Sequence, residues 1–307
     1  MNGIRISAII TTHNRIAYLK KALEGLAEQT LPKDSFEILV VDNASTDKTR
    51  TVVQEEFSEL TNLKYVYEPT LGLSHARNTG WRSARGEYVA FLDDDAIPCP
   101  QWLEKIVEAF ETVEPRPGCI GGKIEPVWEM ERPVWLTDDI ALSLTIIDWS
   151  TVPTFLNEKQ WLAGANIVFP KFLLERFNGF NTSLGRRGTN LISSEEVLLV
   201  RKIKQEGYKV YYHPEIAVRH HILASRLNKQ WFLKRYYWQG VSDALLHRYL
   251  ESPTFAGRWI LIAKNLVRLL IYAKALVTFL LPTDNPDHFA KRCYSLSALG
   301  NIRGLIW

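Results

Sequence analysis

Cysteine is scarce in this chain, and so are long apolar runs near its start. The three cysteines, Cys99, Cys119 and Cys293, are odd in number and widely spaced, which excludes a disulfide framework and a thiolate metal site. The first apolar run, Ile6 to Ile10 with Ser7 inside it, is shorter than a signal peptide needs. We therefore expect a cytoplasmic protein.

The glycine-rich nucleotide-binding signatures are also missing. No G-x-G-x-x-G follows the first strand-like run and no Walker lysine loop occurs anywhere, which argues against a dehydrogenase and against a P-loop ATPase. The 307 residues are 46% apolar and 23% charged, so the chain can bury a large core and is not disordered. We expect one large domain, residues 1–225, with a helical extension over 226–307.

Charge is distributed unevenly along the chain although its net value is only +3. Residues 1–218 hold 24 Lys and Arg against 30 Asp and Glu, whereas residues 219–307 hold 13 against 4. A basic C-terminal part of this kind favours contact with phosphates, on lipid or on nucleic acid.

The first hundred residues alternate between strand-like and helix-like patterns. The strand-like runs are 4–11, 36–41, 63–67 and 88–92. Three helix-like segments separate them: one that Asn14 caps, one that begins at about Asp47, and one over 74–84. This order predicts an α/β fold with a mostly parallel sheet covered by helices on both faces. Residues 116–153 look irregular, and we expect a long functional loop there. Further on, 161–169 and 208–212 are strand-like, and 193–206 and 229–249 are helix-like.

Polar residues follow every predicted strand of this sheet. Ligands of such sheets bind beyond the carboxyl ends of the strands, where the sequence places Thr12 and His13, then Asp42, then Glu68, then Asp93 to Asp95. Any one of them could be an ordinary turn residue. The complete set predicts a ligand site at this edge.

Three consecutive carboxylates, Asp93, Asp94 and Asp95, leave an apolar strand. Carboxylates packed this closely repel one another unless a cation neutralises them, and Mg²⁺ or Mn²⁺ bound to oxygen ligands and to substrate phosphates would do so. A solvated acidic turn is the alternative. His220 or His221 could complete the coordination, although adjacent histidines are more often structural.

Two further features suit a phosphorylated substrate. Arg77 lies on a helix where it could meet a diphosphate, or it is a surface arginine. Glu195 and Glu196 open another helix, where the dipole favours an ionised base. Because adjacent helical residues point about 100° apart, we expect only one of them to face the ligand.

Four motifs taken together resemble the family 2 glycosyltransferases. They are Ile9 to Arg15 (IITTHNR), Val40 to Asp47 (VVDNASTD), Gly72 to Asn78 (GLSHARN) and Phe91 to Asp95 (FLDDD). The likeness continues through Trp161 to Asn166, through Ser194 to Glu196 and to Val218 to His220, and so covers roughly residues 4–250.

The resemblance implies a GT-A fold and an inverting transfer of a sugar from a nucleotide-diphosphate donor, UDP- or GDP-linked, assisted by Mn²⁺ or Mg²⁺. The implied donor-binding residues are Thr12, His13, Asp42, Arg77, Asp93 and Asp94. The implied metal ligands are Asp95 and His220, with His221 the alternative, and the implied base is Glu196, with Glu195 its neighbour. The chain has Ser194 where the family usually has glycine, and Leu198 where an acid is often found.

The acceptor would be a glycan, a polysaccharide or a glycolipid. Gly164 and Asn166 match a family loop near the acceptor, and Trp161 precedes it. Indole faces stack on sugar rings, so acceptor specificity could lie with four tryptophans, although each could equally be a core residue. They are Trp128, Trp135, Trp149 and Trp161.

The apolar stretch from Trp259 to Leu281 is long enough to span a bilayer, but Arg268 near its middle makes that costly. With Lys264 and Lys274 on the same half of the helix, we expect an amphipathic helix on the inner face of the cell membrane, with a core helix or a dimer surface as alternatives. We expect no nucleic-acid partner, because the aromatic residues between 219 and 248 can be explained by packing.

Two other functions remain open. One is a nucleotide-sugar or glycan binder that has lost catalysis. Such a protein would lack Asp95 or Glu196, whereas this chain has both. The other is a glycoside hydrolase, which would need neither nucleotide nor metal.

Overall fold

The computed structural model describes residues 3–273 and 283–307, which form two compact units. Unit 1 comprises Met1–Val127, Ile146–Thr182 and Glu195–His221. Unit 2 comprises Trp128–Thr145, Ser183–Ser194 and Ile222–Trp307. Two segments within the expected first domain, 128–145 and 183–194, thus group with the C-terminal helices.

Unit 1 is built on a nine-stranded sheet in the order β3-β2-β1-β4-β8-β6-β9-β5, with β7 beside β9. The strands are β1 (Ile6–Thr12), β2 (Phe36–Asn43), β3 (Leu63–Glu68), β4 (Tyr88–Asp93), β5 (Ala96–Pro98), β6 (Cys119–Trp128), β7 (Thr154–Phe155), β8 (Asn166–Pro170) and β9 (Val210–Ile222). Strands β1 to β4 are parallel, whereas β8 runs antiparallel to β4 and β6, and β9 runs antiparallel to β5 and β7. The predicted α/β class is confirmed.

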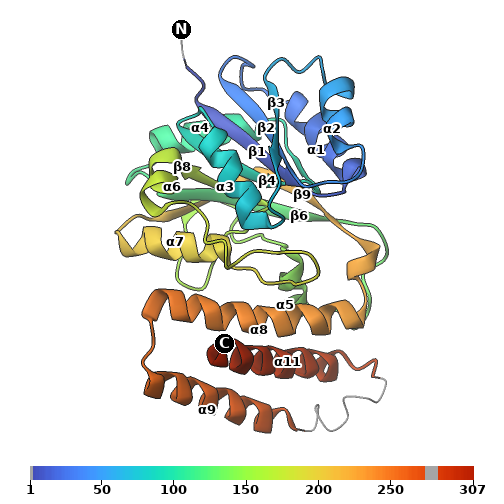
Figure 1. Cartoon of the computed structure of the whole chain (residues 1–307), viewed down its shortest axis with the longest axis vertical. Helices are drawn as coiled ribbons and strands as arrows, with labels where there is room; N and C mark the ends of the chain where they lie inside the picture. The colour runs from blue at the N-terminus through green and yellow to red at the C-terminus, as the bar shows by residue number, and fades with distance from the viewer. Residues whose placement is uncertain (1–2, 274–282) are drawn as a thin grey trace. The chain divides into compact units, whose positions relative to one another are not determined.

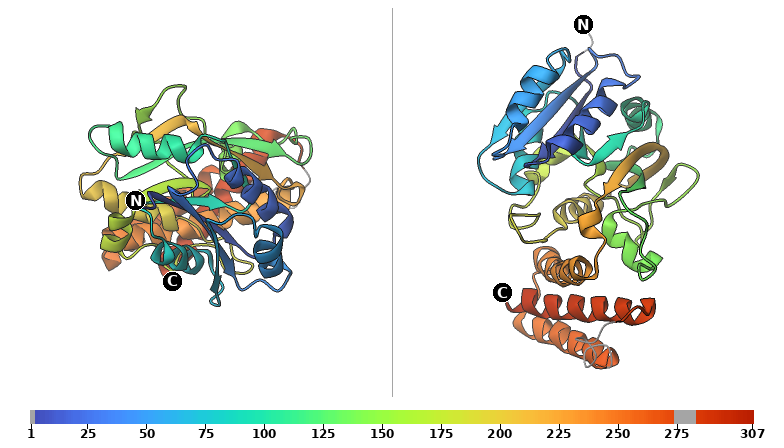
Figure 2. Two further views of the ribbon diagram at one scale, coloured as in Figure 1. Left: turned by 90° about the horizontal axis from the view of Figure 1, so that it is seen from above. Right: turned by 90° about the vertical axis from the view of Figure 1, so that its right-hand side faces the viewer.

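Helices cover both faces of this sheet (Figure 2). They are α1 (Ile16–Ala27), α2 (Thr49–Thr51) with a π-helical turn (Val52–Glu56), α3 (Leu73–Ser83), α4 (Trp102–Thr112), α6 (Lys171–Phe177) and α7 (Glu195–Gln205). Right-handed crossovers from β1 to β2 and from β2 to β3 place α1 and α2 on one face, and the return to β4 places α3 on the other. Strands covered on both sides bury every residue, as β1 and β2 do.

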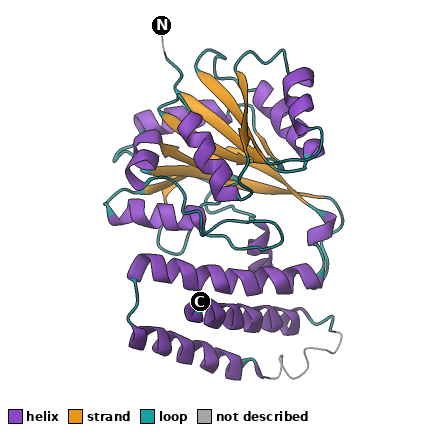
Figure 3. Cartoon of the chain, viewed as in Figure 1, coloured by secondary structure: helices purple, strands orange, loops and turns teal. Residues whose placement is uncertain are grey.

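Unit 2 is helical (Figure 3). Its helices are α5 (Asp138–Ala141), α8 (Lys229–Glu251), α9 (Phe255–Ile271) and α11 (Pro286–Ile306), with 3₁₀ turns at Leu142–Leu144 and Ala224–Arg226. Helix α11 lies between α8 and α9 (Figure 1). It approaches α8 closely because Gly240 and Gly300 have no side chains: a Cβ on either would lie 1.9 Å from a carbonyl oxygen of the other helix.

Several local predictions are wrong. Asn14 does not cap α1, because its backbone is left-handed (φ 54°) and its side-chain oxygen accepts hydrogen bonds from the backbone of Thr46 and Asp47 instead. The segment 116–153 is not one loop, since it contains β6 and α5. Strand β8 begins only at Asn166, and β9 continues past Tyr212 to Ile222.

The predicted amphipathic helix over 259–281 is described only as far as α9 and residue 273, so Lys274 to Leu281 lie outside the described residues. Within residues 3–273 and 283–307, no helix combines the length and the apolar character that crossing a bilayer requires.

Candidate active site

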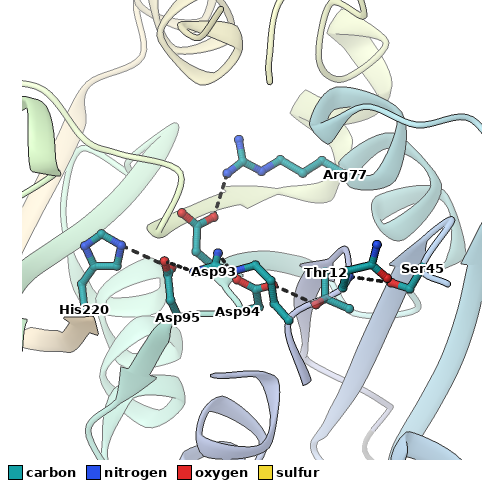
Figure 4. Close-up of polar contacts among 9 residues, drawn as sticks. Thr12, Ser45, Arg77, Asp93, Asp94, Asp95 and His220 are labelled. Carbon is teal, nitrogen blue, oxygen red and sulfur yellow. Dashed lines mark hydrogen bonds and ion pairs between the residues drawn. The ribbon is translucent and has the colours of Figure 1, made fainter. Parts of the chain in front are cut away.

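The carboxyl ends of β1, β2 and β4 meet at one edge of the sheet. The register pairs Thr12 with Asp42 and Thr11 with Asp93, so the predicted strand-exit residues lie side by side. The Thr12 hydroxyl donates a 2.8 Å hydrogen bond to Asp94 Oδ2, which ties β1 to the acidic turn after β4 (Figure 4).

The three aspartates of this turn have different surroundings. Asp93 and Asp95 form a cluster with His220, in which one ligand atom from each residue lies within 4.8 Å of the others. Asp95 Oδ1 is 3.2 Å from His220 Nε2. Asp94 faces Thr12 instead, and burial followed by repulsion from Asp95 raises the pKa of Asp94 to about 7, although the nearby Arg15 opposes the rise.

Strand pairing explains why His220 rather than His221 joins the cluster. Residue Ala96 of β5 pairs with His220 of β9, which brings the imidazole beside Asp95. Adjacent strand residues point to opposite faces, and His221 packs its ring 5.6 Å from that of Tyr18.

Two carboxylates and one imidazole are a donor set that suits Mn²⁺ and can accept Mg²⁺. The spacing of Asp93, Asp95 and His220 and their chemistry therefore fit a divalent cation. Asp93, which the family resemblance assigned to donor binding and the acidic triad to a cation, belongs to the same cluster.

Arg15 is a site residue that the sequence analysis missed. Its Nη1 donates to Asp94 Oδ1 (2.6 Å) and its Nη2 to Asp95 Oδ2 (2.7 Å). Burial disfavours the charged guanidinium, but the attraction of the two carboxylates prevails and the pKa of Arg15 is raised. A single arginine in the turn before α1 gives no sequence signal for contacts with residues 79 and 80 positions away.

Arg77 connects the cluster to the acidic pair on α7. Arg77 is only 2% exposed, and its guanidinium donates to Glu195 Oε1 at 2.6 Å and to Asp93 Oδ1 at 3.1 Å. Gly164 leaves room for it, since a Cβ there would lie 2.1 Å from Arg77 Nη2. The absence of a side chain at Gly164 thus leaves the space that the guanidinium of Arg77 occupies.

The two glutamates of α7 differ in their partners. Glu195 Oε1 is held by Arg77, whereas Oε2 of both Glu195 and Glu196 is buried without a hydrogen-bond partner among the residues that the structure describes. Burial, and then repulsion from Glu195, raises the pKa of Glu196 to about 7 against the attraction of Arg77. Ser194, just before them, has a left-handed backbone with φ 77°, the conformation in which glycine is least strained.

Asp42 lies near the end of β2, and His13, just after β1, contacts the last residue of β2. Asp42 accepts from the Tyr65 hydroxyl (2.7 Å) and from the backbone N–H of Ser45 (2.9 Å), and it is buried. His13 is exposed and donates through Nδ1 to the carbonyl of Asn43 (2.7 Å). Tyr65 was not predicted, because its contact with Asp42 depends on the pairing of β2 with β3.

The structure does not support Asn166 as an acceptor contact. Its side chain is 0% exposed, its Oδ1 accepts from Trp102 Nε1, and its Nδ2 donates to the carbonyls of Ile216 and Lys123. Asn166 therefore joins β8 to its neighbours and has no free polar atom to offer a sugar.

The four tryptophans considered for acceptor specificity lie in different parts of the structure. Trp149 Nε1 donates to the carbonyl of Trp161, and their half-buried rings meet edge to face at 6.2 Å. Trp135, in unit 2, packs edge to face against Phe232 and Phe289, so it is part of the helical core. Trp128 is half-buried at the end of β6.

A cavity of about 460 Å³ borders Glu195 on the side of α3 and α7. Its lining is mostly polar and includes His75, Arg82, Asn181 and Lys202. None of the predicted acceptor residues, Trp161, Gly164 and Asn166, lines it.

Comparison with known proteins identifies the family. The model of "Glycosyl transferase family 2" matches residues 7–183, which is more than half of the chain. The chain belongs to this family.

Known glycosyltransferases resemble this one over most of its length. The glucosyl-dolichyl phosphate glucuronosyltransferase of Haloferax volcanii is 25% identical over 247 residues, 79% of this chain and 77% of that protein. The structure of the mannosyltransferase PcManGT from Pyrobaculum calidifontis, solved with GDP-Man and Mn²⁺, has a TM-score of 0.61 at 23% identity and covers 98% of this chain and 87% of that one. TarS of S. aureus with UDP-GlcNAc has a TM-score of 0.56 at 18% identity and covers 97% and 90%. This glycosyltransferase therefore has the predicted GT-A fold.

Proposed function

We propose that this glycosyltransferase transfers a sugar from a UDP- or GDP-linked donor to an acceptor hydroxyl, with inversion, and that it uses Mn²⁺ or Mg²⁺. One observation carries the proposal: Arg77 links the cluster of Asp93, Asp95 and His220 to the acidic pair, because it donates hydrogen bonds to both Asp93 and Glu195. A donor diphosphate held at the cluster would thus have a potential base close to its sugar.

Each group has a distinct task in this reaction. Asp93, Asp95 and His220 would hold the ion, which when bound supplies positive charge to the diphosphate. Arg77 adds a cation beside the leaving group. Thr12, His13, Asp42 and Asp94 are proposed to line the nucleoside side of the site, as their place at the strand ends suggests.

Glu196 is the proposed base. Glu195 Oε1 already accepts a 2.6 Å hydrogen bond from Arg77. Oε2 is buried without a partner in both glutamates of the described structure, so the choice of Glu196 depends on the engagement of Glu195 Oε1 by Arg77. A carboxylate with a pKa near 7 can take a proton from a hydroxyl and release it again near neutral pH, which typically contributes about 10² to 10⁴ in rate. The acceptor oxygen would attack the anomeric carbon from the face opposite the diphosphate.

Substitution tests these roles. Glu196→Gln and Asp95→Ala should each abolish transfer while the circular dichroism spectrum stays that of the wild type. Glu206→Gln, which removes an exposed glutamate just after α7, is the matched control and should leave turnover unchanged. NMR of the product should show the anomeric configuration opposite to that of the donor. Full turnover by either site variant, or retention of configuration, would refute the corresponding role, and donor binding without turnover in the wild type would favour the inactive binder.

A lipid-linked sugar is the acceptor that we propose. The relative from Haloferax volcanii is named for an acceptor of that kind, glucosyl-dolichyl phosphate. Trp161 and Gly164 stay as the proposed acceptor contacts, because Trp161 is half-buried beside Trp149 and Gly164 borders Arg77. Asn166 is left out for the reason given above.

Helix α9 favours a lipid surface for this enzyme. Its inner face, with Ile262 and Asn265, is buried, whereas its opposite face is apolar and exposed. The exposed apolar residues are Phe255, Trp259, Ile260, Leu266, Val267, Leu270 and Ile271, between 51% and 77% exposed. The helix carries three cations and no acid. An apolar face with basic flanks suits the headgroup region of an anionic membrane.

Sedimentation with vesicles tests this surface. The full chain should sediment with vesicles containing phosphatidylserine, and Trp259→Glu with Leu266→Glu should abolish that sedimentation. Tyr249→Glu, at an exposed aromatic residue of α8, is the control and should bind normally. Unchanged sedimentation of the double variant would refute the assignment. A wild-type chain that does not bind vesicles but forms a dimer, which Leu266→Glu dissociates, would also refute it.

A further inference from the structure

The guanidinium of Arg15 shares a carboxylate with the proposed metal site. Asp95 presents Oδ1 to His220 Nε2 at 3.2 Å and Oδ2 to Arg15 Nη2 at 2.7 Å. Any cation that binds Asp95 must therefore share the charge of this carboxylate with Arg15. Asp95 is 2% exposed, so solvent screens the repulsion between the two cations only weakly.

Arg15 is held in this place from three sides. Its second nitrogen donates to Asp94 Oδ1 at 2.6 Å, and its guanidinium lies over the ring of Tyr18 at 5.0 Å. Its side chain is 26% exposed. Because leaving would abandon two charge-assisted hydrogen bonds, we expect the guanidinium to stay when a cation arrives.

We infer that Arg15 is a positioning residue that weakens the affinity of the donor-free site for divalent cations, so that the ion binds tightly only together with a diphosphate. The inference depends on the metal site proposed above. A negatively charged diphosphate would offset the repulsion that Arg15 exerts, which couples the binding of metal and donor.

Manganese binding without donor tests the inference. Titration of the full chain with Mn²⁺, followed by electron paramagnetic resonance at about pH 8 to keep the carboxylates ionised, should give a dissociation constant roughly tenfold lower for Arg15→Gln than for the wild type. Arg15→Lys keeps the charge and should resemble the wild type. Lys20→Gln makes the same charge change on the first turns of α1, where Lys20 pairs with Glu56, and should also resemble the wild type.

A second comparison covers the case in which Arg15→Gln does not fold. Asp94 is outside the metal-binding cluster but shares Arg15, so Asp94→Asn should weaken Mn²⁺ binding, and Arg15→Gln in the Asp94→Asn background should restore it by roughly the same tenfold factor. Equal or weaker Mn²⁺ binding on loss of Arg15, in each background that folds, would overturn the inference.

Nucleoside diphosphate separates the two proposals. Added UDP or GDP should tighten Mn²⁺ binding more in the wild type than in Arg15→Gln. A wild type that binds no Mn²⁺ even with either diphosphate would refute the metal site itself, whereas a wild type that binds Mn²⁺ with no change on loss of Arg15 would refute only the role of Arg15.

Discussion

Replacing Gly164 by alanine should displace Arg77 from its buried position. The added Cβ would lie 2.1 Å from Arg77 Nη2 and 2.7 Å from its Cζ, closer than non-bonded atoms can approach. The guanidinium cannot simply swing away, because Arg77 is 2% exposed and paired with both Glu195 and Asp93. One methyl group in this place should therefore break the link between the metal-binding cluster and the acidic pair.

The size of the effect follows from what the methyl group must disturb. Overpacking a tight site typically costs about 1–3 kcal/mol, and breaking a buried ion pair costs about 3–5 kcal/mol. Because the guanidinium can yield partly, we expect Gly164→Ala to lower the free energy of unfolding by about 3 kcal/mol. Transfer should fall as well, since Arg77 would be displaced from the position proposed to lie beside the donor diphosphate.

Urea denaturation of a double-mutant cycle measures this effect. Arg77→Lys removes the planar group that the methyl would strike, so Gly164→Ala should cost much less in that background, with a coupling energy of at least about 1 kcal/mol. Gly3→Ala is the control, since no atom lies within 4 Å of a Cβ at that position, and it should change stability by less than about 0.5 kcal/mol. Additive effects, or a Gly164→Ala variant as stable and active as the wild type, would refute the reasoning.

Three further predictions concern other parts of the molecule. Ser194→Gly should raise the free energy of unfolding in urea by about 0.5–1 kcal/mol, because φ is 77° there and glycine relieves that strain; a loss of stability would contradict this. The pKa of Glu196 is raised from 4.5 to about 7 in the folded chain. Between these pH values the folded chain therefore binds more protons than the unfolded chain, and stability should fall as pH rises through this window. Turnover should rise over the same window towards a plateau. Glu196→Gln should reduce the stability slope but not remove it, because the pKa of Asp94 is also raised to about 7; a slope unaltered by that substitution would count against the assignment. Trp135→Ala should destabilise unit 2 by about 2–4 kcal/mol, since it removes ring contacts with Phe232 and Phe289, and should leave the acceptor KM unchanged; a raised KM at unchanged stability would restore Trp135 to the acceptor site.

Strands β1, β2 and β4 of the parallel half could be predicted because they are buried on both faces and consist largely of apolar residues. The antiparallel half could not. Strand β6 contains Gly121 and Gly122, which look like loop residues, but a Cβ on Gly122 would lie 1.9 Å from the carbonyl oxygen of Ile216. These glycines permit close contact between strands. Strand β9 continues past Pro214 because it exchanges its partner β7 for β5.

The candidate site was predictable to the extent that it depends on strand ends. Thr12, Asp42 and the acidic turn follow from parallel topology, and the family resemblance chose His220 over His221 as the metal ligand. Arg15 and Tyr65 were missed because their contacts join elements far apart in sequence. A motif match does not reveal that the side chain of Asn166 is fully engaged by Trp102 of α4 and by backbone carbonyls of neighbouring strands.

Calorimetric titration of the wild-type enzyme with UDP- and GDP-sugars, with and without Mn²⁺, tests the central claim most directly. The account predicts that one donor class binds in the presence of Mn²⁺, that EDTA abolishes this binding, and that Asp95→Asn weakens it strongly. Binding of the donor that is equally tight with EDTA or in Asp95→Asn would contradict the claim that Asp93, Asp95 and His220 hold a cation for the diphosphate.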